Sequence, residues 1–287
     1  MTLLSRRSFL AVSVMLPWAV SARAVTSIPV GLEMYSVRDS LKQDTEGTLR
    51  AIAKFGYQGV EFYAPYINWS DTQTRVIRKL LNQLRLRCFS THNDESYFSG
   101  ENLRKARYLN TKLGSKYLVM ASSQPKPGLE GWKEVAEMLN AAADRLAPDG
   151  LKVGYHNHEV EFTPLEGRRP IEILAENTKP EVMLQLDVGT CLKAGGDPVA
   201  WIRSNPGRIR SLHLKDWSPD PAKGFKVLFG EGVADWKGIL DAAESVGGVE
   251  YYLIEQEGSR FSELETAQRC LEAFRTLRPA TQASNYY

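Results

Sequence analysis

The chain has 287 residues, of which 43% are apolar and 24% are charged, a balance that excludes disordered and fibrous proteins. Its formal net charge of +2 gives no broad basic surface, so nucleic-acid binding is not indicated. The length suits one large domain, since barrels of about 250 residues are the common single-domain architecture of this size.

The N-terminus has the pattern of an export signal. An Arg6-Arg7 pair precedes an apolar stretch over residues 9–20, and small residues follow at positions 22 and 24. Such a pattern is typical of a signal peptide, and the apolar run is too short for a stable membrane span. We predict a twin-arginine signal peptide over residues 1–24, which places the mature protein in the periplasm or outside the cell. Its cleavage removes three arginines and changes the formal net charge from +2 to −1.

The three cysteines give no disulfide framework. Cys88, Cys191 and Cys270 are far apart and odd in number, which argues against paired cysteines in an exported protein of this size. We expect Cys88 and Cys270 to lie in the core as small apolar residues.

Beyond the signal, short apolar runs alternate with segments of helical period. The predicted strands are Val30–Tyr35, Gly59–Tyr63, Arg87–Thr91, Tyr117–Met120, Lys152–His158, Met183–Asp187, Ile209–Leu214 and Tyr251–Glu255. The predicted helices are Thr45–Phe55, Thr72–Leu84, Asn102–Leu113, Gly131–Leu146, Pro170–Glu176, Pro198–Arg203, Trp236–Ser245 and Glu263–Leu277.

Strict alternation of this kind indicates parallel strands, because parallel strands need crossover helices. Eight such units close a barrel, so we predict a single (β/α)8 TIM barrel over residues 25–279 and a tail over 280–287. The alternative is an open doubly wound sheet. No glycine-rich phosphate loop follows the first predicted strand, as would be expected if such a sheet bound a dinucleotide.

All four histidines lie at the C-terminal ends of predicted strands, where barrel enzymes build their active sites. They are His92, His156, His158 and His213. A single histidine at such a place is usually a partly buried structural residue. Four on one rim predict a functional site.

Carboxylates join them on successive strands. Asp187 ends the sixth predicted strand, His213 lies in the seventh and Glu255 ends the eighth. Carboxylate and imidazole ligands suit one divalent metal, with Mn²⁺ expected and Mg²⁺, Co²⁺ or Zn²⁺ as alternatives. The other interpretation is a structural network of ion pairs at the barrel mouth.

The fourth ligand is expected from the polar segment 154–162 at the fifth strand. Glu161 is the first choice, because it lies beyond the strand and would fold back over the site. His156 and His158 follow in that order, and they share one face of the strand because side chains alternate.

We expect further residues to contact the substrate or to take part in catalysis. Glu255, His156 or His158 would remove a proton, and Lys215 would stabilise the negative charge that develops on the substrate. The substrate-binding candidates are Glu61, His92, Asp216 and Trp217. The long insertion between Asp216 and Asp235 would form a functional loop at the same end of the barrel.

Five sequence blocks resemble the xylose-isomerase-like sugar phosphate isomerase/epimerase superfamily, and the resemblance extends from Ile28 to Leu277. The blocks are Gly154–Phe162, Leu186–Thr190, Gly195–Pro198, Leu212–Trp217 and Gly230–Trp236. The resemblance implies a metal-dependent barrel that acts on ketoses, inosose-like polyols or keto-glycosides. Members hold the metal with Glu, Asp, His and Glu from strands five to eight. Asp187, His213 and Glu255 match three of these, and His156 stands where the epimerases have glutamate.

The expected function is therefore a divalent-metal-dependent sugar isomerase or epimerase that works through an enediolate on a keto-sugar or polyol. One alternative is a 3-keto-glycoside lyase or hydrolase that uses the same site. Another is an exported barrel that binds a sugar or a metal without turnover. The endonuclease branch of the superfamily is disfavoured, because it needs more histidines and a basic DNA-binding face.

Overall fold

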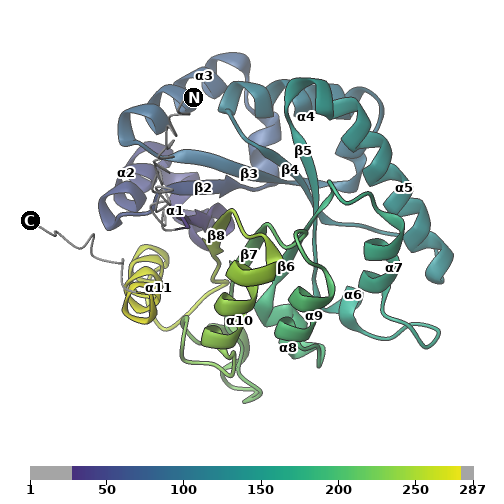
Figure 1. Ribbon diagram of the computed structural model, residues 1–287. Helices are drawn as coiled ribbons and strands as arrows, with labels where there is room; N and C mark the ends of the chain where they lie inside the picture. Colours follow the sequence, from purple (N-terminus) through teal and green to yellow (C-terminus); the bar gives the residue numbers. More distant parts are fainter. Residues whose placement is uncertain (1–27, 279–287) are drawn as a thin grey trace, which may run out of the picture.

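The computed structural model describes residues 28–278 (Figure 1). Its strands are β1 (Val30–Glu33), β2 (Gly59–Phe62), β3 (Arg87–Asp94), β4 (Tyr117–Ser122), β5 (Lys152–His156), β6 (Met183–Asp187), β7 (Ser211–Leu214) and β8 (Tyr251–Ile254). All neighbouring strands are parallel, and β1 pairs with β8 to close the ring. The predicted (β/α)8 barrel is confirmed. The predicted signal peptide and the tail over 280–287 lie outside the described residues.

Helices surround the barrel (Figure 1). The main helices are α2 (Thr45–Phe55), α3 (Asp71–Leu84), α4 (Gly100–Leu113), α5 (Leu129–Leu146), α7 (Pro170–Asn177), α9 (Pro198–Ser204), α10 (Trp236–Ala242) and α11 (Glu263–Leu277). Each corresponds to a predicted helix. Gly56 and Gly114 end α2 and α4 with φ of 99° and 70°, the left-handed conformation that glycine adopts without strain.

Short helices that the sequence did not predict follow several strands. They are α1 (Arg38–Gln43), α6 (Glu159–Phe162) and α8 (Val188–Lys193). Single turns of 3-10 helix also follow β1, β2 and β3, over Met34–Val37, Ala64–Asn68 and Glu95–Phe98. These elements lie at the C-terminal ends of the strands, so they form the rim of the barrel mouth.

Apolar side chains fill the middle of the barrel, and a layer of polar side chains lies between them and the barrel mouth. The apolar residues are Phe89, Tyr117, Val119, Met183, Tyr251 and Leu253. Gly31 and Gly59 leave room for the Phe89 ring, because a Cβ atom there would lie 2.9 Å and 2.5 Å from it. Residues two positions apart in a strand point the same way. The next inward positions toward the mouth are therefore polar: Glu33, Glu61, His156, Gln185 and Glu255.

The rest of the core lies between the strands and the helices. Cys88, Cys191 and Cys270 are buried there and free, in agreement with the absence of a disulfide framework. Within residues 28–278, no helix is both long enough and apolar enough to span a bilayer.

Asp216 organises the long loop between β7 and α10. The buried Asp216 carboxylate accepts backbone N–H hydrogen bonds from Gly230 at 2.9 Å and Gly232 at 3.1 Å, and from the Trp236 indole at 2.9 Å. It also accepts the Trp217 N–H at 2.9 Å. These contacts do not support the expected role of Asp216 in substrate binding, because both of its oxygens already accept hydrogen bonds within the loop.

Asp216→Asn is expected to destabilise the protein by about 2–4 kcal/mol, because an amide nitrogen would face the loop's N–H donors inside the protein. Urea unfolding measures the change, and limited proteolysis within residues 217–235 shows whether the loop opens. Asp220→Asn is the control, since Asp220 lies exposed in the same loop and accepts one N–H, from Ala222. Equal stability of the two variants would contradict this role for Asp216.

Candidate metal centre

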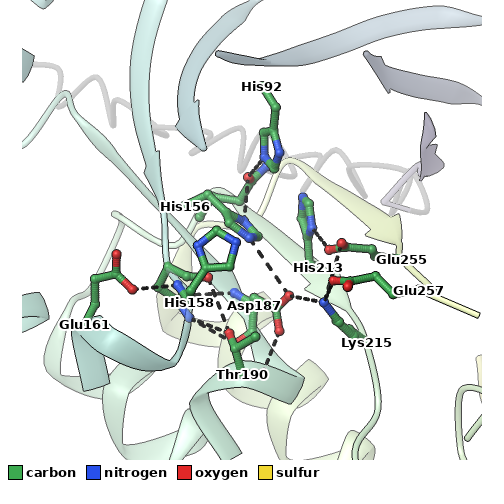
Figure 2. A network of polar contacts seen from close by, with 12 residues as sticks. His92, His156, His158, Glu161, Asp187, Thr190, His213, Lys215, Glu255 and Glu257 are labelled. Carbon is green, nitrogen blue, oxygen red and sulfur yellow. Dashed lines mark hydrogen bonds and ion pairs between the residues drawn. The ribbon is translucent and has the colours of Figure 1, made fainter. Parts of the chain in front are cut away.

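Four side chains converge where strands β5 to β8 end. His156 is the last residue of β5, Asp187 is the last of β6, His213 lies in β7 and Glu255 directly follows β8. One potential ligand atom from each lies within 4.8 Å of the others, and all four residues are buried (Figure 2). The structure thus brings the three expected ligands together and adds His156 as the fourth residue.

The Asp187 carboxylate is held on one side and has no hydrogen-bond partner on the other. Its Oδ1 accepts the Thr190 backbone N–H at 2.8 Å. Its Oδ2 is buried without a hydrogen bond, 3.7 Å from Lys215 Nζ and 4.0 Å from His156 Nε2. Burial raises the pKa of Asp187. An unpaired buried carboxylate oxygen costs free energy. A cation bound between Asp187 Oδ2 and the side chains of His156, His213 and Glu255 would remove that cost.

Lys215 places a fixed positive charge among three carboxylates. Its Nζ lies 3.5 Å from Glu255 Oε1 and 3.7 Å from Asp187 Oδ2, and it forms an ion pair with Glu257. Burial alone would lower the pKa of Lys215, but these three carboxylates raise it overall. Lys215 therefore stays protonated at neutral pH and acts as a cation rather than as a base.

His213 lies between two carboxylates. Its Nδ1 is 2.5 Å from Glu255 Oε2, and its Nε2 is 2.8 Å from Glu61 Oε1. Burial disfavours the charged ring, but Glu61 and Glu255 raise the pKa of His213 well above its usual value. Burial would likewise raise the pKa of Glu255, but Lys215 and His213 hold it well below its usual value. The carboxylates and their partners thus stabilise one another's charged forms.

Gln185 connects the histidines, and the sequence analysis did not single it out. It lies in β6, two residues before Asp187 and on the same inward face. Its Nε2 donates to Glu61 Oε2 at 3.0 Å. Its Oε1 lies 2.8 Å from His92 Nε2 and 3.1 Å from His156 Nδ1. The only sequence signal was a polar residue on the inward face, between the two leucines of the Leu184-Gln185-Leu186 stretch.

The partners of Gln185 determine which way its amide points. Burial would raise the pKa of Glu61, but His92 and His213 lower it overall, so Glu61 is an ionised group that only accepts hydrogen bonds. The Gln185 nitrogen must therefore face Glu61, and its oxygen must accept N–H bonds from both histidines. His156 then carries its proton on Nδ1, which leaves a free lone pair on Nε2, the atom nearer Asp187.

Glu161, the residue first expected as the fourth ligand, does not belong to this group. It lies in α6, where its Oε1 accepts the Tyr155 hydroxyl at 2.7 Å and its Oε2 accepts the His158 backbone N–H at 2.7 Å. Figure 2 shows Glu161 apart from the group around Asp187. Both oxygens are engaged in fixing the turn after β5, whereas His156, the second candidate, lies within the group.

A second cluster of potential ligand atoms comprises Glu33, Glu61 and His92. Glu61 Oε1 already lies 2.8 Å from His213 Nε2 and 3.0 Å from His92 Nε2. Its Oε2 accepts from Gln185. The His156–Asp187–His213–Glu255 group takes one residue from each of four adjacent strand ends, so it is the stronger candidate for a metal centre.

A pocket of about 350 Å³ lies at the metal centre. His92, His156 and Glu255 line it, together with His158, which is exposed and has its ring centroid 5.0 Å from that of His156. Trp217 does not line this pocket, so its expected role in substrate binding is not supported. Its backbone carbonyl accepts the Val233 N–H, within the loop that Asp216 organises.

Residues 49–278 match the family of xylose isomerase-like TIM barrels. The chain belongs to this family. It is 26% identical over 186 residues to an inosose dehydratase from Geobacillus thermodenitrificans, and the match covers 59% of this chain. The chain spans only 52% to 62% of the length of this and two other curated relatives.

Solved structures of similar fold agree with this membership. A sugar phosphate isomerase/epimerase from Parabacteroides distasonis has a TM-score of 0.76 and 25% identity, covering 92% of this chain and 99% of that one. The IolI protein with a bound zinc atom has a TM-score of 0.68 and 17% identity, covering 87% of this chain and 97% of that one. At that identity the second likeness shows the fold alone.

Gln185→Met is expected to weaken metal binding about 10- to 100-fold, because it keeps the volume of the side chain but removes the group that fixes the His156 ring. Isothermal titration with Co²⁺ measures the affinity, and ¹⁵N-histidine NMR of the metal-free protein reports which His156 nitrogen carries the proton. Gln58→Met is the matched control, since Gln58 accepts the Val30 N–H at the opposite end of the barrel. An unchanged His156 tautomer and an unchanged Co²⁺ affinity would show that Gln185 has no such role.

Proposed function

We propose that this protein is a divalent-metal-dependent enzyme that removes a proton next to the carbonyl of a keto-sugar or a cyclic polyol ketone, through an enediolate. One observation carries the proposal: the buried Asp187 Oδ2 has no partner within a group that also includes His156, His213 and Glu255. Family membership supports a carbohydrate substrate. Relatives named inosose dehydratase support a keto-polyol among the candidates.

The donor set fits a divalent transition metal. Two carboxylates and two imidazoles suit Mn²⁺, Co²⁺ or Zn²⁺, and Mn²⁺ is the metal we expect; the imidazoles make Mg²⁺ the least suited. A bound divalent ion supplies Lewis acidity at the substrate carbonyl and its neighbouring hydroxyl, which makes the adjacent C–H more acidic. Asn157 and Thr190 keep the Asp187 segment in place, through hydrogen bonds of 3.0 Å and 2.8 Å.

In this proposal His158 transfers the proton. Its ring lies exposed in the pocket, while His156 and Glu255 belong to the metal-binding group and Lys215 is held protonated. Imidazole is the commonest general base in enzymes. Lys215 contributes a fixed positive charge close to the group, which stabilises negative charge as it develops on the substrate.

The same first step leads to different products. Return of the proton to the opposite face gives an epimer, and its transfer to the neighbouring carbon gives an isomer. Loss of a hydroxyl from the next carbon as water, or of an alkoxy group as an alcohol, makes the enzyme a lyase. The relatives named inosose dehydratase support elimination, whereas the structural neighbour named sugar phosphate isomerase/epimerase supports proton return.

The proposal includes export by the twin-arginine route. The Arg6-Arg7 pattern supports it. That route carries folded proteins, so a metal bound in the cytoplasm would travel with the barrel. The substrate would then be a sugar met outside the cytoplasm.

The Mn²⁺-loaded protein is expected to exchange a C–H proton of a keto-sugar with D₂O, because proton removal is common to all these reactions. Proton NMR of fructose, 3-keto-glucose and an inosose measures the exchange, and chelation should abolish it. Asp187→Asn should lose most of the bound metal, as determined by elemental analysis. Metal binding without exchange on any of these ketones would favour the alternative of a binding protein without turnover.

His156→Gln and His158→Gln form a matched pair on one strand end. The first is expected to weaken metal binding by at least about tenfold, because it removes a ligand. The second should lower kcat about 10²- to 10⁴-fold while leaving the metal content unchanged, because it removes only the proton acceptor. Metal analysis and the exchange rate separate the two effects. Loss of metal in both variants would assign His158 to the metal centre instead.

A further inference from the structure

A second hollow lies next to the pocket at the candidate metal centre. Asp94 and Ser122 line the first pocket, of about 350 Å³. The same two residues line a neighbouring groove of about 570 Å³. Because they share these two residues, the two spaces lie next to each other at the ends of β3 and β4.

The groove is polar and has no positively charged lining residue. Seven of its eight lining residues are polar, among them Glu95, Ser96 and Gln124, and Met138 is the exception. Hydroxyl, amide and carboxylate groups hydrogen-bond to sugar hydroxyls, whereas a phosphate or carboxylate ligand would call for arginine or lysine. The groove therefore fits a neutral, hydroxylated group.

Contacts across its wall give the groove a fixed shape. The Gln124 backbone N–H donates to Glu95 Oε2 at 2.8 Å, which ties the segment after β4 to the turn after β3. Ser123 Oγ lies 2.9 Å from the Tyr155 hydroxyl. The pairing of β3 with β4 shifts register between Asn93 and Asp94, and irregularities of this kind re-aim side chains beside active sites.

The other side of the first pocket suits a sugar ring. Glu33 lines it, and Glu33 Oε1 is buried without a hydrogen-bond partner. Tyr35 and Tyr63 stand beside it in an edge-to-face pair with ring centroids 5.3 Å apart, and Tyr35 is 39% exposed. A sugar would supply the missing donor to Glu33 and an apolar C–H face to a tyrosine ring.

We propose that the substrate is a glycoside of two units, with the keto-sugar ring at the metal centre and a second, neutral hydroxylated unit in the Asp94–Ser122 groove. This inference rests on the proposed function, because it assumes that the first ring is the one that reacts. A free monosaccharide would leave the groove without a ligand, so the groove distinguishes glycosides from free sugars.

Ser96→Trp tests the proposal, because Ser96 is exposed and lines the groove but not the first pocket, so an indole there would block only the second unit. Ser204→Trp is the matched control, since Ser204 is exposed on α9, outside the barrel. Saturation-transfer NMR and calorimetry on the Zn²⁺-loaded protein compare glucose with lactose, cellobiose, maltose and sucrose. At least one disaccharide should bind at least about tenfold more tightly than glucose and show transfer to both rings. Ser96→Trp should remove that advantage without changing glucose binding.

Two results would overturn the proposal: no disaccharide binds more tightly than glucose, or Ser96→Trp leaves the disaccharide advantage intact. Gln124→Ala provides a second variant at an exposed position of the groove that does not line the first pocket, and it should weaken only the disaccharide. Failure of the groove is distinguishable from failure of the proposed function. If only the groove proposal is wrong, metal-dependent proton exchange on a free keto-sugar persists. If the proposed function is wrong, that exchange is absent, whether or not a disaccharide binds.

Discussion

The mouth of the barrel depends on balancing negative charge in a place from which water is largely excluded. Glu61, Asp187 and Glu255 are all buried there, and each would be costly to ionise alone. Lys215 and His213 supply positive charge that partly balances these carboxylates, through contacts of 2.5 Å to 3.7 Å. That compensation leaves Asp187 Oδ2 without a hydrogen bond. A cation at this point would complete the balance, which is why the charge arrangement and the proposed chemistry have the same origin.

The fold was predictable because it follows from periodicity. Every predicted strand and helix is present, since apolar runs of strand length and segments of helical period record which faces are buried. Asp187, His213 and Glu255 were predictable as neighbours for a related reason: each ends or nearly ends an apolar strand, and the ends of adjacent parallel strands meet at one rim. Gln185 was not, because one amide between two leucines has no motif, and its role depends on partners from three other strands.

The roles of acidic residues beyond the strand ends could not be predicted in this way. Asp216 and Glu161 lie in polar segments next to the site, and sequence position gave both of them functional roles. In the structure each carboxylate accepts backbone N–H groups, Asp216 from its long loop and Glu161 from the turn after β5. A strand end fixes the direction of a side chain through its alternation, whereas a loop does not. Position along the chain could therefore place these residues at the rim but could not show which way they point.

The charge of the site also limits the substrate. With His156 in place of a carboxylate, Asp187 and Glu255 bring two negative charges to the group, which a divalent cation would match. Lys215 then pairs with Glu257, and Glu61 is held by hydrogen bonds from its neighbours. No lysine or arginine is among the residues that line the pocket, whereas Glu33, Asp94 and Glu257 are. A phosphorylated sugar would meet acidic side chains and no lysine or arginine in the pocket lining to bind its phosphate. The pocket therefore favours an uncharged sugar, even though the structural neighbour is named for sugar phosphates.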